Sequence, residues 1–71
     1  MVIRVSDPTV LPALISDLEE RAHYVVKPVG ADTLAVGVLG SFVDGGELDL
    51  TLFLLAWQAA HPGTTVDLIE R

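Results

Sequence analysis

Residues 24–39 read Y-V-V-K-P-V-G-A-D-T-L-A-V-G-V-L and carry the pattern that decides the fold. Two runs rich in β-branched residues, 24–29 and 33–39, are separated by a Gly-Ala-Asp segment at 30–32. Those three residue types favour a short hairpin loop. We therefore predict two antiparallel strands joined by a tight turn.

The residues before this hairpin predict a strand followed by a helix. Residues 2–6 read V-I-R-V-S and indicate a first strand that ends at Asp7. Residues 9–23 predict an amphipathic helix, because apolar side chains recur at intervals of three and four. With Asp7 as N-cap, Pro12 would lie one turn into the helix and remove a hydrogen bond, so we predict Thr9 as the N-cap and Asp7-Pro8 as the connecting turn.

The residues after the hairpin predict a second helix and a last strand. Asp44 and Glu47 form a D-x-x-E capping box, which predicts a helix that opens there and continues to about Ala60. The segment His-Pro-Gly at 61–63 ends this helix. Residues 65–70 alternate apolar and polar side chains, as a half-buried strand does.

This order of elements predicts one α+β domain over residues 1–71. Two right-handed crossovers that share one sheet place the four antiparallel strands in the order 4-1-3-2, with both helices on one face. The layout resembles the ferredoxin-like βαββαβ two-layer sandwich. The alternation of side chains assigns the open face of the sheet, which is the face without helices, to Arg4, Lys27, Ala35, Gly37 and Asp67. Arg4 and Asp67 should be neighbours there.

The second helix has more apolar surface than a two-layer domain needs. One stripe can face the sheet and contains Leu48, Leu52, Leu55, Ala56 and Ala59. A second stripe beside it contains Leu50, Phe53, Leu54 and Trp57. Soluble monomers seldom expose so large an apolar patch, so either the first helix or another chain should cover the second stripe.

Composition limits the partners. The chain has 71 residues, 51% hydrophobic side chains, no Cys and a formal charge of −6. Its four basic residues are spread along the sequence, which argues against nucleic acid and against an anionic membrane surface as partners. The N-terminus lacks the pattern of a signal peptide, and the apolar stretch 48–60 is shorter than a membrane span, so we expect a cytoplasmic protein.

The residues that could carry chemistry are few. His23 and His61 fall at the ends of the two helices, where the helix dipole favours them. We expect the helices to run in the same direction, which would make the two histidines neighbours, yet they lack a carboxylate that completes a metal site. The spacing of Asp44, Glu47 and Asp49 is not that of an EF-hand and indicates capping of the second helix. We predict no catalytic residue, no metal and no cofactor.

Residues 3–18, I-R-V-S-D-P-T-V-L-P-A-L-I-S-D-L, resemble the first strand and helix of ACT-type regulatory domains. The resemblance implies a small-molecule site at the strand–helix and hairpin loops. The residues concerned are Asp7, Thr9, Val10, Gly30, Asp32 and Thr33.

Two functions therefore stay open. The first is a non-enzymatic protein-association module, a homodimer or a domain that binds another protein, and the second is the ACT-like regulatory domain. Because aromatic residues on a helix are common interface anchors, the association surface is predicted on the second helix, and the small-residue sheet face is its alternative. The first surface comprises Leu50, Phe53, Leu54 and Trp57, and the alternative comprises Ala35 and Gly37.

Overall fold

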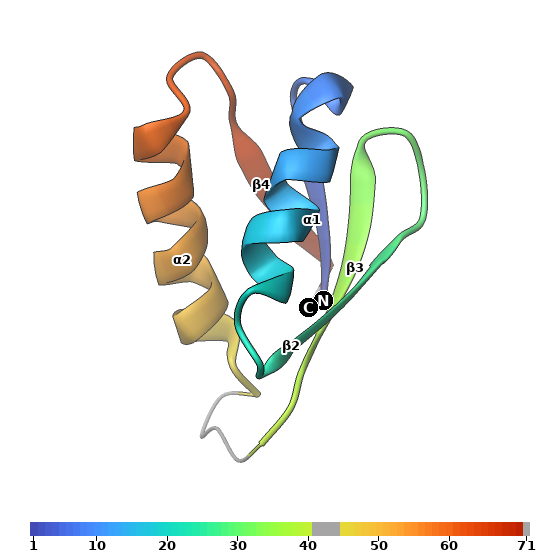
Figure 1. The fold of residues 1–71 in the computed structure, drawn as a ribbon, viewed down its shortest axis with the longest axis vertical. Coiled ribbons are helices and arrows are strands. Elements are labelled where there is room, and N and C mark those ends of the chain that lie inside the picture. Colours follow the sequence, from blue (N-terminus) through green and yellow to red (C-terminus); the bar gives the residue numbers. More distant parts are fainter. Residues whose placement is uncertain (41–44, 71) are drawn as a thin grey trace.

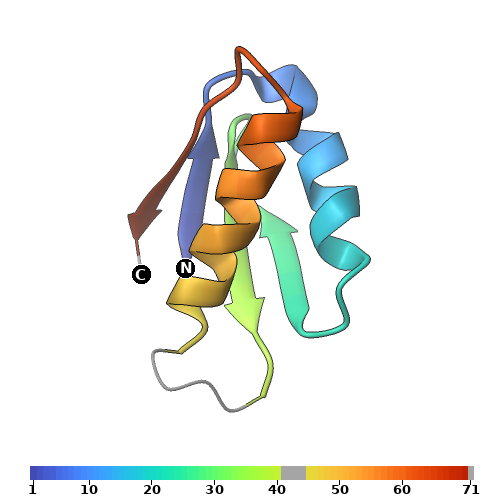
Figure 2. The same ribbon diagram turned by 90° about the vertical axis from the view of Figure 1, so that its left-hand side faces the viewer.

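The chain folds into two layers, a four-stranded antiparallel sheet and a pair of helices that cover one of its faces (Figures 1 and 2). This computed structural model describes residues 1–40 and 45–70. In chain order the elements are β1 (Val2–Val5), the short 3-10 helix η1 (Pro8–Val10), α1 (Leu11–Glu19), β2 (Tyr24–Pro28), β3 (Thr33–Val38), α2 (Glu47–Ala60) and β4 (Val66–Glu70).

The sheet has the order β2-β3-β1-β4, which is the predicted order read from the other edge. The predicted α+β class and strand order are thus confirmed, and the arrangement is compatible with a ferredoxin-like fold. The β2–β3 hairpin closes at its loop, where the Val29 N–H donates to the Thr33 carbonyl at 3.0 Å. The first strand pairs with β3 on one side and with β4 on the other.

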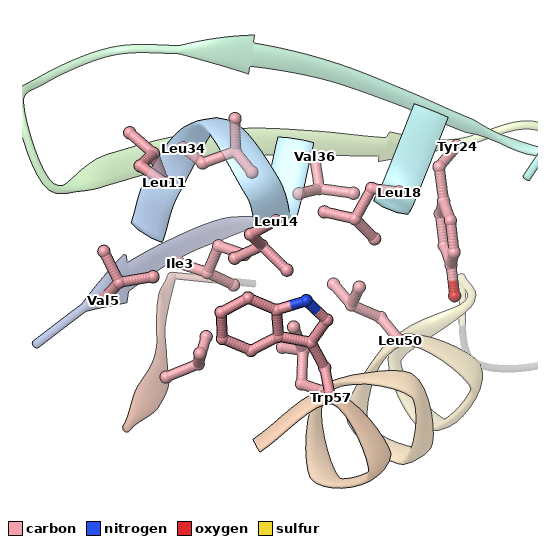
Figure 3. Close-up of a cluster of buried hydrophobic side chains, with 12 residues drawn as sticks. Ile3, Val5, Leu11, Leu14, Leu18, Tyr24, Leu34, Val36, Leu50 and Trp57 are labelled. Atoms are coloured by element: carbon pink, nitrogen blue, oxygen red, sulfur yellow. The ribbon is translucent and has the colours of Figure 1, made fainter. Parts of the chain in front are cut away.

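The core lies between the helix layer and one face of the sheet (Figure 3). Burial of each large apolar side chain contributes about 1.5–3 kcal/mol, so this layer supplies most of the stabilisation that the chain has. Tyr24 is the one core residue of β2 and was not predicted there. The core comprises Ile3, Val5, Leu11, Leu14, Leu18, Tyr24, Leu34, Val36, Leu50, Leu54, Trp57 and Val66.

The start of the first helix differs from the prediction. Asp7 is the N-cap of η1, and its carboxylate accepts hydrogen bonds from the Thr9 N–H at 3.0 Å and the Thr9 hydroxyl at 2.7 Å. These bonds lower the pKa of Asp7. The prediction of Thr9 as N-cap is wrong, because a separate 3-10 turn lets Pro8 and Pro12 each occupy the first turn of its own helix.

The end of the first helix is also earlier than predicted. The helix stops at Glu19, four residues before His23. The Arg21 N–H donates to the Leu18 carbonyl at 3.0 Å, and the Tyr24 N–H donates to the Arg21 carbonyl at 3.2 Å. These two turns redirect the chain so that Tyr24 enters β2 with its side chain in the core.

The second helix begins at Glu47, with Gly46 as its N-cap. The predicted start at Asp44 is wrong; Asp44 itself lies outside the described residues. Gly46 has φ +90°, and a Cβ there would lie 2.7 Å from Val38 Cγ1. A helix that enters the core beside Val38 therefore needs glycine at its cap.

The two helices run antiparallel, in contrast to the predicted common direction (Figures 1 and 2). Asp17 of α1 contacts Trp57 near the end of α2, whereas His23, after α1, contacts Asp49 in the first turn of α2. The strand–helix–strand path requires this, since each helix runs back along the strand that precedes it. His23 and His61 consequently lie at opposite ends of the helix layer.

Candidate functional site

The open face of the sheet carries the alternative interface residues where they were predicted. Ala35 is half-buried and Gly37 is exposed, both on β3 near the middle of the sheet. Val25 on β2 is 54% exposed and Ile69 on β4 is 46% exposed. The open face therefore has exposed apolar side chains at its edges and only short side chains at its centre.

The register places four residues in one row across this face. Lys27 pairs with Ala35, Ala35 with Val2, and Val2 with Glu70. Directly opposed residues of an antiparallel pair point to the same side of the sheet, so Lys27, Ala35 and Val2 share the open face. A register shift in β4 leaves Ile69 without a partner and brings Glu70 opposite Val2, at the end of this row. The row has a lysine at one edge, a glutamate at the other and two small apolar side chains between them.

Arg4 lies one row further along the same face. It is a cross-strand partner of Asp67, as predicted. Its Nε, however, lies 3.9 Å from Oδ2 of Asp32, in the hairpin loop of the same chain. The pair is exposed and contributes at most about 1 kcal/mol, but it balances the charge of Arg4 within the chain.

The stripe predicted as the main interface is in the core. Leu50 is fully buried, Leu54 and Trp57 are each 5% exposed, and Phe53 is half-buried against them. A partner therefore cannot contact Leu50, Leu54 and Trp57. Their prediction as part of the interface is wrong. The sheet and α1 cover them, which is the alternative that the sequence left open (Figure 3).

The stripe predicted to face the sheet is instead the outer face of α2. Leu48 is 62% exposed, and Leu52 and Leu55 are each 58% exposed. The spacing of four and then three residues puts these side chains in line along the helix. We call Leu48, Leu52 and Leu55 the leucine stripe.

A polar cluster joins the start of β2 to the start of α2. The Tyr24 hydroxyl donates a hydrogen bond to Asp49 Oδ2, and His23 Nε2 lies 2.9 Å from the same oxygen. The bonds from Tyr24 and His23 lower the pKa of Asp49, which keeps that carboxylate ionised at neutral pH. Burial, together with the bond and charge of Asp49, raises the pKa of the Tyr24 hydroxyl. The cluster links Tyr24 of β2 and His23 in the turn before it to the first turn of α2.

A groove of about 620 Å³ runs between α1 and α2. Within it the Trp57 Nε1–H donates to Asp17 Oδ2 at 2.8 Å. The Arg21 guanidinium lies 4.8 Å from the centre of the Phe53 ring, a cation–π distance. The groove is lined by Asp17, Glu20, Arg21, Asp49, Leu52, Phe53, Ala56 and Trp57.

His61 has the structural role predicted for it. Its Nδ1 lies 2.8 Å from the Trp57 carbonyl, and its ring stacks on the Trp57 indole at 3.9 Å. Within residues 1–40 and 45–70, no group of three or more His, Cys, Asp or Glu side chains is arranged to hold a metal ion.

The residues of the ACT-like prediction lie at one end of the sheet, where η1 and the β2–β3 loop meet (Figure 1). The Asp7 carboxylate is engaged by Thr9, and the Thr33 hydroxyl donates to Asp32 Oδ1 at 2.8 Å. The Gly30 N–H donates to the Thr33 carbonyl at 3.3 Å, and Val10 is half-buried. These polar groups thus satisfy one another.

Sequence reasoning missed the residues of the groove and the polar cluster. Tyr24 shares the strand face of Val26, so the alternation along β2 was a usable signal for its burial. The indole N–H of a buried Trp needs an acceptor, but nothing local identifies Asp17, which is 40 positions away. That contact depends on how the helices pair.

Comparisons with protein-family models, with curated proteins and with solved structures find no match for this chain. The ACT-like interpretation of residues 3–18 gains no support from them. None of the helices in the described part of the chain has the length and apolar character that crossing a bilayer requires.

Proposed function

We propose that this chain is a small acidic, non-enzymatic association module that pairs with a second copy through the open face of its sheet. The observation that carries the proposal is the row Lys27, Ala35, Val2 and Glu70. Opposite charges occupy opposite edges of the sheet, and small apolar side chains lie between them.

The strand order makes this row self-complementary. A two-fold axis parallel to the strands, midway between β3 and β1, places β2 of one copy over β4 of the other and β3 over β1. Lys27 then faces the partner's Glu70, and Ala35 faces the partner's Val2. Each contact occurs twice, as an isologous interface requires.

The centre of the face suits close stacking. Two sheets pack about 10 Å apart when the side chains between them are of moderate size. Ala35 and Gly37 keep the centre of β3 low, and the ion pair of Arg4 with Asp32 leaves no unbalanced cation there. Four strands of about five residues give a face of roughly 19 by 17 Å, or about 320 Å² on each copy, which is less than the roughly 800 Å² per partner of a standard interface. We therefore expect a weak dimer that forms at tens of micromolar.

Ala35→Glu should dissociate the dimer without unfolding the chain, because it buries a carboxylate at the centre of the two stacked faces. Sedimentation equilibrium at tens of micromolar should give the mass of two chains for the wild type and of one chain for this variant. Leu55→Glu adds the same charge on the helix layer and should remain dimeric. A wild type with the mass of one chain, or equal dissociation of both variants, would reject the open face as the interface.

A further inference from the structure

The leucine stripe and the groove between the helices form one continuous surface. Leu52 belongs to both, and Ala56 lies on the same side of α2 as the groove. Both helices lie on one face of the sheet (Figure 2), so this surface, which is formed by residues of the helix layer, lies opposite the open sheet face. A molecule bound there would therefore not compete with the sheet-face dimer.

The groove combines apolar and anionic groups. Phe53, Ala56 and Trp57 provide apolar lining, and carboxylates of Asp17 and Asp49 border it. Both carboxylates are held in position by bonds within the chain, Asp17 by the Trp57 indole and Asp49 by the Tyr24 hydroxyl. A cationic side chain can lie along such a lining with its charged end at the carboxylates.

Arg21 shows this chemistry inside the chain. Its guanidinium lies over the Phe53 ring at 4.8 Å, and the charge of Asp49 is close enough for Arg21 to contribute to lowering the pKa of that carboxyl. An aromatic ring with a carboxylate beside it thus already accommodates one guanidinium. Elsewhere in the groove, Lys or Arg side chains from another molecule would meet the carboxylates of Asp17 and Glu20 beside its apolar lining.

The negative charge of this surface limits which partners can bind it. A second copy would bring the same helix layer, whose acidic side chains outnumber Arg21, and like charges would face each other. Nucleic acid and anionic lipid are repelled for the same reason. The acidic side chains of this layer are Asp17, Glu19, Glu20, Glu47 and Asp49.

We propose that the helix layer docks a basic amphipathic helix of a different protein. Leucine-like residues of that helix at helical spacing would pack on the leucine stripe, and Lys or Arg side chains on its flank would enter the groove. The leucine stripe spans the eight residues 48–55, about 10 Å of helix axis, which matches two turns of an incoming helix.

A synthetic 18-residue helix of leucine and lysine, with leucines on one face and no tryptophan, is the probe. Trp57 is the only tryptophan of the chain and lines the groove, so its fluorescence reports occupancy directly. A peptide with the same composition in scrambled order, which has no apolar face, is the control. We expect saturable binding of the amphipathic peptide at least tenfold tighter than that of the scrambled peptide in 150 mM salt.

Two matched variants locate the binding. Ala56→Arg places a cation at the groove, and Thr51→Arg adds the same charge on the far side of the exposed face of α2. Ala56→Arg should weaken binding at least tenfold and Thr51→Arg no more than about twofold. Glu20→Lys, at the exposed C-cap of α1, should also weaken peptide binding. This variant replaces Ala56→Arg in the test if Ala56→Arg does not fold.

Equal affinity for the scrambled peptide, equal loss in Ala56→Arg and Thr51→Arg, or no saturable binding would overturn this inference. The monomeric Ala35→Glu variant should bind the amphipathic peptide as the wild type does. Failure of the sheet-face dimer and failure of the helix-layer site are thus measured separately.

Discussion

Leu50→Ala is expected to lower the free energy of unfolding by about 2–5 kcal/mol, whereas Leu48→Ala should lower it by less than about 0.5 kcal/mol. The two leucines are two residues apart on α2, yet Leu50 is fully buried and Leu48 is 62% exposed. Truncation of Leu50 removes contacts with the core and leaves a cavity, and truncation of Leu48 does neither.

The effect of Leu50→Ala is large on the scale of the whole molecule. A chain of 71 residues at about 0.05–0.15 kcal/mol per residue has a stability of about 4–11 kcal/mol. Urea unfolding of both variants at one protein concentration measures the difference. A larger loss for Leu48→Ala than for Leu50→Ala would mean that α2 presents the opposite face to the sheet.

Gly46→Ala is expected to cost about 2–5 kcal/mol, from two separate causes. The backbone at φ +90° is strained for any residue with a Cβ, at about 1–2 kcal/mol. The new Cβ would also lie 2.7–2.9 Å from three atoms of the Val38 side chain, and such overpacking costs about 1–3 kcal/mol more.

Gly63→Ala is the matched control for this substitution. Gly63 also has φ +90°, but a Cβ there has nothing within 4 Å. It should show the backbone cost alone, so the difference between the two variants measures the contact with Val38. Val38→Ala combined with Gly46→Ala should remove part of that difference, because it deletes Cγ1 and Cγ2 but keeps the Cβ at 2.9 Å. Equal losses for Gly46→Ala and Gly63→Ala would mean that the chain does not need close approach at the start of α2.

The fold was predictable because the sheet is encoded locally. The two β-rich runs around residues 30–32 specify a hairpin, and the alternation along each run assigns its faces correctly. With a helix on each side of the hairpin and a strand at each end, the rules for crossovers leave one strand order. Ala35 and Gly37 were assigned to the open face on this basis.

The faces of α2 were not predictable in the same way. Apolar residues occur on almost every side of this helix, so its periodicity indicates no single direction. Two stripes were compatible with the pattern, and the wrong one was assigned to the sheet. The choice depends on which stripe fits Ile3 and Leu14 across the core, and this is a property of the packed structure.

The two candidate sites differ in how far the sequence predicts them. In the row of Lys27, Ala35, Val2 and Glu70, side-chain alternation predicts the face of Lys27 and Ala35. The position of Glu70 depends on a register shift in β4 that alternation does not reveal. The groove depends on contacts between helices far apart in sequence. The groove was not predicted, because the two helices were expected to run in the same direction.

Pairing of two open sheet faces is tested most directly by exchange of the charges at the ends of the row. Lys27→Glu and Glu70→Lys should each weaken the dimer, because like charges would then face each other across the interface twice. The double variant restores opposite charges at both contacts and keeps the net charge of −6. Sedimentation equilibrium at tens of micromolar should give the mass of one chain for each single variant and of two chains for the double variant. A double variant with the mass of one chain, or single variants with the mass of two, would contradict the pairing of β2 with the partner's β4.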